Sequence, residues 1–151
     1  MAMRRLLCLL PSLALLLFAA DPWTPRDLIE PSALAARLPL KANGAMLIYT
    51  GFPVLYRSAH IPGSVYAGPG SKAEGIDDLK KAVTGQPKDR EIILYCGCCP
   101  FDKCPNLRPA FAALREMGYK NVHAVHMPEN MHTDWTGHGY PIEKSPEKPA
   151  L

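Results

Sequence analysis

The chain has 151 residues, of which 48% are apolar and 21% are charged, and its formal net charge is +3. This length accommodates one domain of ordinary size, and the composition excludes a disordered or low-complexity protein. The 16 prolines lie mostly between the periodic segments, which indicates many short, stiff connections.

The amino-terminal segment differs from the rest of the chain. Arg4 and Arg5 precede an apolar run that extends to Phe18, and small residues follow it. This arrangement is typical of a secretory signal peptide, and the run is shorter than the roughly 20 residues that span a membrane. We therefore expect residues 1–20 to be a signal peptide and residues 21–151 to form one domain of an exported protein, periplasmic or secreted. An uncleaved anchor or a buried helix is the alternative.

Removal of this segment takes away Arg4 and Arg5 and lowers the formal charge from +3 to +1. A charge so close to zero gives no reason to expect a nucleic acid or an anionic membrane surface as partner.

Predicted helices and strands alternate along the rest of the chain. Pro31 stands at a favourable first helical position, Asn106 is a candidate N-cap, and Gly118 is a stop signal. In chain order the pattern predicts a helix over 31–38, a strand over 45–50, a Gly- and Pro-rich loop with a short strand at 64–66, a helix over 73–85, a strand over 91–96, a helix from 107 to 118, a strand over 121–125 and a short helix within 129–135. This alternation predicts an α/β domain with a mostly parallel central sheet flanked by helices.

Four of the five cysteines lie between positions 96 and 104, at the end of the strand over 91–96 and in the loop that follows it. Cys96 ends that strand, and ligands of parallel sheets bind beyond the carboxyl ends of strands. The next helix begins near Asn106, and the N–H groups and dipole of a helix N-terminus lower a thiol pKa and hold anions. Cys96 is therefore the candidate nucleophile. Lys103 and Arg108 either add positive charge to the loop or are ordinary solvated side chains.

Five segments resemble, in order, the motifs of the rhodanese-like domain family, over about residues 24–144. LIEPSALAARL resembles the opening strand and helix of the family, and AHIPGSV resembles its G-H-I-P-G-A signature. EIILYC resembles the strand that ends in the active cysteine, and AFAALREMGYKNVHAV resembles the helix and strand that follow. DWTGHGYPIEK is similar to the W-x-x-x-G-Y-P ending.

The resemblance implies a single rhodanese-like domain that acts as a sulfurtransferase of the thiosulfate type. Cys96 would take a sulfane sulfur from a donor such as thiosulfate, hold it as a persulfide and pass it to a thiol acceptor, which is covalent catalysis in two displacements. The partners implied are these small substrates, and no cofactor or metal is expected. The expected substrate-binding residues are Gly97, Cys98, Cys99, Lys103 and Arg108.

The chain departs from the family pattern at two places, and the second also bears on a comparison with related phosphatases. Tyr49-Thr50-Gly51 stands where the family usually has Asp-x-Arg. The loop Gly97–Pro105 is several residues longer than usual and has three extra cysteines but no arginine. Related phosphatases carry an arginine six residues after the cysteine, and Asp102 at that position disfavours a phosphate cradle.

The three extra cysteines leave several roles open. A disulfide between Cys104 and either Cys98 or Cys99 would leave Cys96 free, or one of these thiols would resolve a redox reaction begun at Cys96. The third role is a soft-metal site, but adjacent Cys98 and Cys99 would struggle to reach one tetrahedral centre together with Cys96. A non-catalytic binding module is the fourth alternative.

The histidines indicate no metal or catalytic site. We expect His60, within AHIPGSV, to hydrogen-bond backbone and hold its turn in place. The other histidines, at positions 123, 126, 132 and 138, are scattered without the spacing of a ligand set.

Overall fold

The computed structural model of the protein describes residues 23–41 and 44–145. The predicted signal peptide therefore lies outside the described residues. The elements are η1 Pro25–Asp27, β1 Leu28–Ile29, α1 Pro31–Ala35, β2 Met46–Tyr49, α2 Pro53–Ser58, β3 Val65–Tyr66, α3 Ala73–Val83, β4 Ile92–Tyr95, η2 Phe101–Lys103, α4 Leu107–Glu116, β5 Val122–Val125, α5 Met131–Asp134 and η3 Thr136–His138. None of the helices within these ranges is long and apolar enough to cross a membrane.

The strands of the described chain form one five-stranded sheet in the order β1-β5-β4-β2-β3, and all of its pairs are parallel. β4 lies in the centre, where Ile93 pairs with Leu47 of β2 and with His123 of β5. A strand buried on both faces and both edges needs a continuous apolar run, which the sequence IILY supplies. The predicted α/β fold with a mostly parallel sheet is confirmed.

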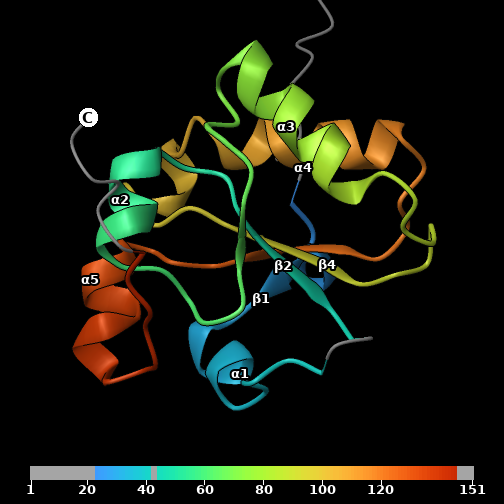
Figure 1. Ribbon diagram of the computed structural model, residues 1–151. Helices are drawn as coiled ribbons and strands as arrows, with labels where there is room; N and C mark the ends of the chain where they lie inside the picture. Colours follow the sequence, from blue (N-terminus) through green and yellow to red (C-terminus); the bar gives the residue numbers. More distant parts are fainter. Residues whose placement is uncertain (1–22, 42–43, 146–151) are drawn as a thin grey trace, which may run out of the picture.

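The side chains of β4 alternate between two apolar cores. Ile92 and Leu94 pack with the residues of α3 and α4, which cover one face of the sheet (Figure 1). Ile93 and Tyr95 pack on the other face, with residues of α1 and α5. Cys96 continues this alternation, so its side chain belongs to the core under α3 and α4.

The main difference from the predicted elements is α2, which lies in the segment expected to be loop. None of its residues is buried, and Val54 is 61% exposed, so the segment lacks the apolar periodicity by which a helix is predicted. α1 is shorter than expected because it ends at Ala35 rather than at residue 38. The proline after Leu38 disfavours helical backbone at that residue.

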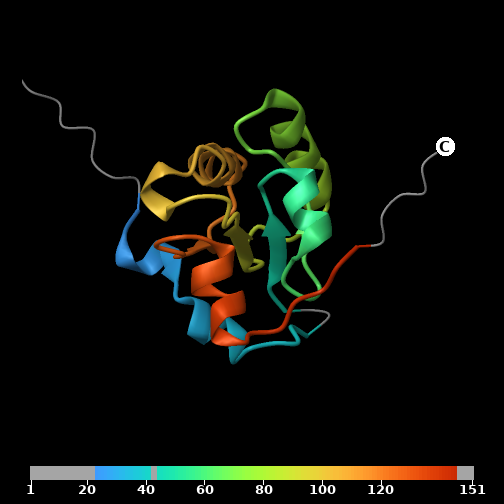
Figure 2. The same cartoon turned by 90° about the vertical axis from the view of Figure 1, so that its left-hand side faces the viewer.

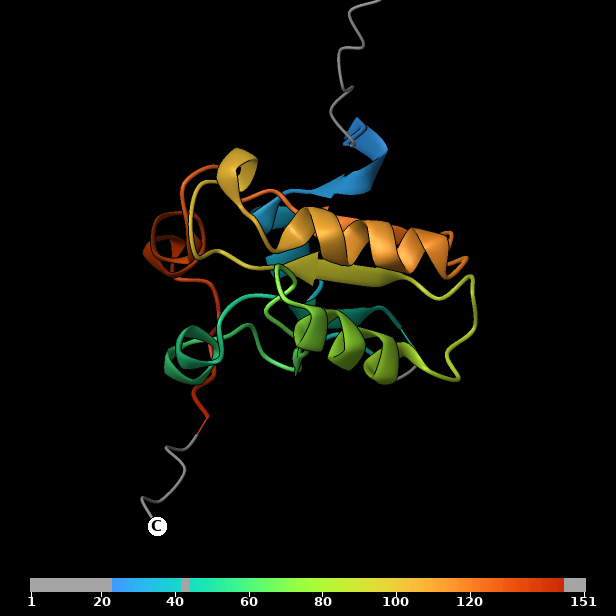
Figure 3. The same cartoon turned by 90° about the horizontal axis from the view of Figure 1, so that it is seen from above.

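The elements that follow the strands gather at the carboxyl edge of the sheet. Figure 2 looks onto this edge, where α2, α5 and the loop after β4 surround the end of that strand. Figure 3 shows the same three segments together on one side of the molecule, beyond the point to which β4 runs. The cysteine loop thus lies where parallel sheets place their ligands.

Candidate active site

Cys96 is held by the central strand and faces a cavity at the carboxyl edge. It directly follows Tyr95, whose carbonyl accepts a hydrogen bond of 2.9 Å from the backbone N–H of Thr50. Only 1% of Cys96 is exposed, yet the residue lines a cavity of about 330 Å³. The lining residues are Tyr49, Leu55, Ser58, Ala59, Cys96, Gly97, Cys98, Asn130, Met131, His132 and Thr136. A small anionic or thiol substrate fits a space of this size.

Gly97 turns the chain out of the strand and into the loop. Its φ of +70° lies in the left-handed region, and a Cβ there would come within 2.7 Å of the Cβ of Met131. Its carbonyl accepts a hydrogen bond of 2.9 Å from the backbone N–H of Met131 at the start of α5. Only glycine combines this conformation with this close approach, so Gly97 docks α5 against the loop.

The loop after β4 places the four thiols close together. The Sγ atoms of Cys96 and Cys98 are 3.1 Å apart, and those of Cys98 and Cys99 are 3.2 Å apart. The Sγ atoms of Cys96, Cys98 and Cys104 all lie within 4.8 Å of one another. All four cysteines are free thiols in the structure. The disulfide expected between Cys104 and Cys98 or Cys99 stays a prediction.

The side chain of Asn106 contacts the thiols. Asn106 is the N-cap residue of α4, as predicted, but its side chain is fully buried and makes no cap hydrogen bond. Its Nδ2 donates to the Sγ atoms of Cys96, at 3.5 Å, and Cys98, at 3.7 Å. Its Oδ1 accepts from the backbone N–H of Ser71, at 3.1 Å, which fixes the orientation of the amide. Sequence reasoning missed this role, because Ser71 belongs to a loop far away in the sequence.

The N-terminus of α4 serves Cys104 rather than Cys96. The pKa of Cys104 is lowered, first by hydrogen bonds from the thiols of Cys96 and Cys98 and then by those from the backbone N–H groups of Asn106 and Leu107. The pKa of Cys96 is raised, because its thiol donates to Cys104 and is buried. The lowered Cys96 pKa predicted from the sequence is therefore wrong, since the first turn of α4 points at the other end of the loop.

Gly51 explains part of the departure at Tyr49-Thr50-Gly51. A Cβ on Gly51 would lie 2.8 Å from the Sγ of Cys96 and 2.5 Å from the hydroxyl oxygen of Tyr49. Both distances are too short for real contacts, so no larger side chain fits here without moving the thiol. Glycine at this position leaves room for the sulfur of Cys96.

The predicted substrate-binding residues fall into two groups. Gly97 and Cys98 line the cavity beside Cys96. Cys99 is half-buried, Lys103 and Arg108 are exposed, and none of these three is among the residues that line it.

Four polar side chains that sequence reasoning missed also line the cavity. Ser58 comes from α2, and Asn130, His132 and Thr136 come from α5 and its flanks. For Asn130, His132 and Thr136, the only signal in the sequence was the predicted short helix within 129–135. That pattern does not reveal that the helix contacts the cysteine loop.

His60 has the structural role expected of it. It is 6% exposed, its Nδ1 hydrogen-bonds the carbonyl of Tyr56 at 2.8 Å, and its ring stacks on the ring of the same tyrosine. Its backbone pairs with Glu143 near the end of the described chain. The prediction that His60 holds its turn through backbone hydrogen bonds is confirmed.

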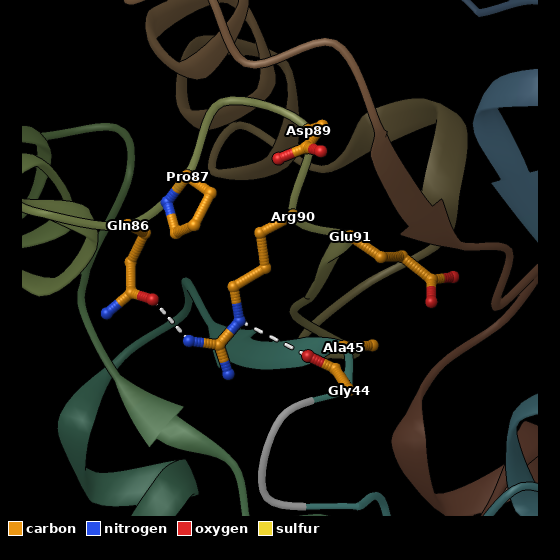
Figure 4. Close-up of a pocket in the computed structure, with 7 residues that line it drawn as sticks. All are labelled: Gly44, Ala45, Gln86, Pro87, Asp89, Arg90 and Glu91. Carbon is orange, nitrogen blue, oxygen red and sulfur yellow. Dashed lines mark hydrogen bonds between the residues drawn. The ribbon is translucent and has the colours of Figure 1, made fainter.

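A second, larger cavity of about 550 Å³ lies at the opposite, amino edge of the sheet, before β2 and β4 (Figure 4). The guanidinium of Arg90 reaches across it, with Nε donating to the carbonyl of Gly44 at 3.2 Å and Nη1 donating to the side chain of Gln86. None of the predicted site residues lines this cavity. The smaller cavity, which Cys96 and Cys98 line, is therefore the candidate active site.

The chain is similar to known proteins. The model of a family described as the rhodanese-like domain matches residues 33–127, which is more than half of the chain. A search of curated proteins found no match.

Three solved structures illustrate the likeness of the fold. The BH2092 protein of Bacillus halodurans is similar with a TM-score of 0.61 and 18% identity, covering 80% of this chain and 78% of that one. The rhodanese-like domain of the Alr3790 protein from Anabaena sp. has a TM-score of 0.56 and 20% identity, covering 83% and 86%. A single-domain sulfurtransferase of Saccharomyces cerevisiae has a TM-score of 0.56 and 17% identity, covering 83% and 99%. At these identities the likeness shows a shared fold.

Proposed function

Because the chain belongs to the rhodanese-like domain family, we propose that it is a sulfurtransferase that carries a sulfane sulfur as a persulfide on Cys96. The observation that carries this proposal is the position of Cys96. It is the thiol that stands at the carboxyl end of the central strand, it lines the cavity, and it has donors beside its sulfur. The other three thiols lie in the loop that follows.

Two displacements move the sulfur. In the first, the Cys96 sulfur attacks the outer sulfur of a donor such as thiosulfate, the S–S bond of the donor breaks, and sulfite leaves with the electron pair. The proton of the Cys96 thiol passes along its hydrogen bond to the Cys104 sulfur. In the second, a thiolate acceptor attacks the outer sulfur of the persulfide, and Cys96 leaves as a thiolate.

Hydrogen-bond donors around Cys96 support the intermediate. The backbone N–H of Cys98 and the side-chain amide of Asn106 both donate to the Cys96 sulfur. Donors fixed in a buried site stabilise a persulfide anion without first having to reorient. The polar side chains of Ser58, Asn130 and Thr136 line the space in which the sulfonate end of a donor would lie.

Single cysteine variants test the proposal. With thiosulfate as donor and either cyanide or a small thiol as acceptor, Cys96→Ser should abolish sulfur transfer. Cys98→Ser and Cys104→Ser should slow it, while Cys99→Ser, whose thiol does not line the cavity, is the matched control. Circular dichroism confirms that each variant is folded. Full activity in Cys96→Ser, with one of the other variants inactive, would overturn the assignment of the nucleophile.

A thiol-disulfide oxidoreductase is the second candidate, favoured by the 3.1 Å between the sulfurs of Cys96 and Cys98. Cys96 would attack a substrate disulfide to form a mixed disulfide and release one thiol. Cys98 would then attack the Cys96 sulfur, releasing the second thiol and leaving a Cys96–Cys98 disulfide. A wild-type protein that reduces disulfides, but forms no persulfide with any donor, would select this candidate.

We also propose, from the sequence alone, that the protein is exported. Its basic start and apolar run support this. Recovery of the native protein from the cytoplasm with Met1 retained would contradict it.

A further inference from the structure

Three of the four clustered thiols are arranged like the ligands of a metal ion. The Sγ atoms of Cys96, Cys98 and Cys104 lie within 4.8 Å of one another, and Cys96 and Cys104 are buried. Three sulfurs that each lie about 2.3 Å from one central ion are about 4 Å apart. The thiols are therefore close to a trigonal set, in which the 3.1 Å between the sulfurs of Cys96 and Cys98 would widen on binding.

The structure removes the objection that the sequence raised against a metal. That objection was that adjacent Cys98 and Cys99 would not reach one centre together with Cys96. In the structure the third sulfur of the set is that of Cys104, which lies just before α4. Cys99 is not a member of this set, although its sulfur touches that of Cys98.

We propose that the reduced chain binds one monovalent copper ion through the sulfurs of Cys96, Cys98 and Cys104. Soft thiolates select soft ions, and monovalent copper accepts three of them in a plane, whereas structural zinc takes four ligands. No histidine or carboxylate of the described residues belongs to the cluster as a fourth ligand.

The surroundings of the thiols suit an anionic metal centre. A copper ion with three thiolates carries a net charge of −2, which a buried site must compensate. The side-chain amide of Asn106 donates to Cys96 and Cys98, and the backbone N–H groups of Asn106 and Leu107 point at Cys104. Such outer contacts orient the ligands and contribute to metal affinity.

The copper proposal does not rest on sulfur transfer, because it is argued from the positions of three thiols, although the two functions share Cys96. The ion and the persulfide compete for Cys96. The disulfide expected from Cys104 to Cys98 or Cys99 removes at least one ligand, so only the reduced chain binds copper.

Anaerobic titration of the reduced full chain with monovalent copper, in competition with bicinchoninate, tests the proposal. We expect one equivalent to bind with thiolate-to-copper charge-transfer absorption, and X-ray absorption to show three sulfur neighbours. Cys98→Ser and Cys104→Ser should each weaken binding by more than about 100-fold, beyond the usual loss from an outer-shell change. Cys99→Ser is the matched control and should bind like the wild type.

Four results would overturn the proposal. They are absence of binding to the reduced chain, undiminished binding by Cys98→Ser or Cys104→Ser, equal binding by the oxidised chain, and a centre of four sulfurs that Cys99→Ser destroys. Each of these readouts is separate from sulfur transfer, so a failure of one proposal is distinguishable from a failure of the other. Melting curves of the variants without copper show whether they are folded.

Discussion

Gly51 and Asn106 show how single residues determine the position of the Cys96 sulfur. The first has no side chain where one would collide with that sulfur, and the second donates a hydrogen bond to it. Neither belongs to the cysteine loop. Their contacts with the sulfur could not be predicted from the sequence, because they depend on segments that are close only in the folded protein.

Replacement of Gly51 by alanine should displace the thiol. The new methyl group would lie 2.8 Å from the Sγ of Cys96, so the sulfur or β2 must shift. We expect a loss of about 1–3 kcal/mol in the free energy of unfolding, measured by urea titration, because the site is buried and tightly packed. Sulfur transfer should fall further than stability explains. Wild-type turnover in Gly51→Ala would contradict the assigned position of the sulfur.

Replacement of Asn106 by aspartate separates its two contacts. The carboxylate still accepts from the N–H of Ser71, but it offers no donor to the thiols and adds a negative charge beside them. We expect sulfur transfer to fall at least about tenfold at neutral pH, because a lost donor to a charged sulfur costs about 1.5–3 kcal/mol. Activity should return in part as the pH falls and the carboxyl is protonated.

The exposed change Asn121→Asp is the control for the added charge. A purely structural Asn106 would give Asn106→Asp a lower melting temperature but an unaltered pH profile of turnover.

At the scale of elements, α4 connects the site to the first strand. Its amino end holds Cys104, and near its other end Arg115 donates to the Oδ1 of Asp27 at 2.8 Å. Asp27 also accepts from the backbone N–H and the hydroxyl of Thr24, at 2.9 and 2.7 Å. The carboxylate therefore ties η1, which leads into β1, to the helix that begins at the thiols.

This carboxylate makes stability depend on pH. Burial alone would raise the pKa of Asp27, but the hydrogen bonds from Thr24 and the guanidinium of Arg115 outweigh it, and the net shift is downward from the ordinary value of 3.8. A lowered folded-state pKa stabilises the fold above the unfolded-state pKa. That stability is lost as the pH falls through the folded-state value.

Asp27→Asn should therefore lower the free energy of unfolding by about 1–2 kcal/mol at pH 7, as Arg115 is partly solvated. The gap between wild type and variant should narrow as the pH falls below about 4. Asp77→Asn, an exposed change on α3, should leave stability almost unchanged. Urea titrations at several pH values measure both, and a gap that is constant down to pH 3 would show that the carboxylate charge contributes nothing.

Elements with a strong apolar pattern could be predicted, and those without one could not. The apolar run IILY predicted β4, and the spacing of Leu107, Phe111 and Leu114 predicted the apolar face of α4. α2 has no buried residue, so the period of a helix is absent from its sequence. For the same reason the sequence did not predict that residues of α2 line the cavity beside Cys96.

At the scale of the whole molecule, parallel topology puts the ends of β2 and β4 and the loops after them at one edge. The strand that ends in Cys96 therefore predicted that Cys96 lies at this edge, which the structure confirms. The chemistry implied by the likeness to a known family stays a prediction. The path of the cysteine loop, which returns to Cys96, could not be predicted from the sequence. Spacing alone did not reveal that Cys104, eight positions later, would lie beside Cys96 and accept hydrogen bonds from the backbone at the start of α4.

The proposed sulfur transfer depends on Cys96 as the carrier of the sulfur. Its most direct test is intact mass spectrometry of the reduced protein before and after thiosulfate, followed by peptide mapping without reductant. A persulfide on Cys96 predicts a gain of one sulfur atom, located on Cys96, in the wild type and in Cys99→Ser, and no gain in Cys96→Ser. A persulfide located on Cys104 or Cys98 while Cys96 stays unmodified, or a gain that survives in Cys96→Ser, would contradict it.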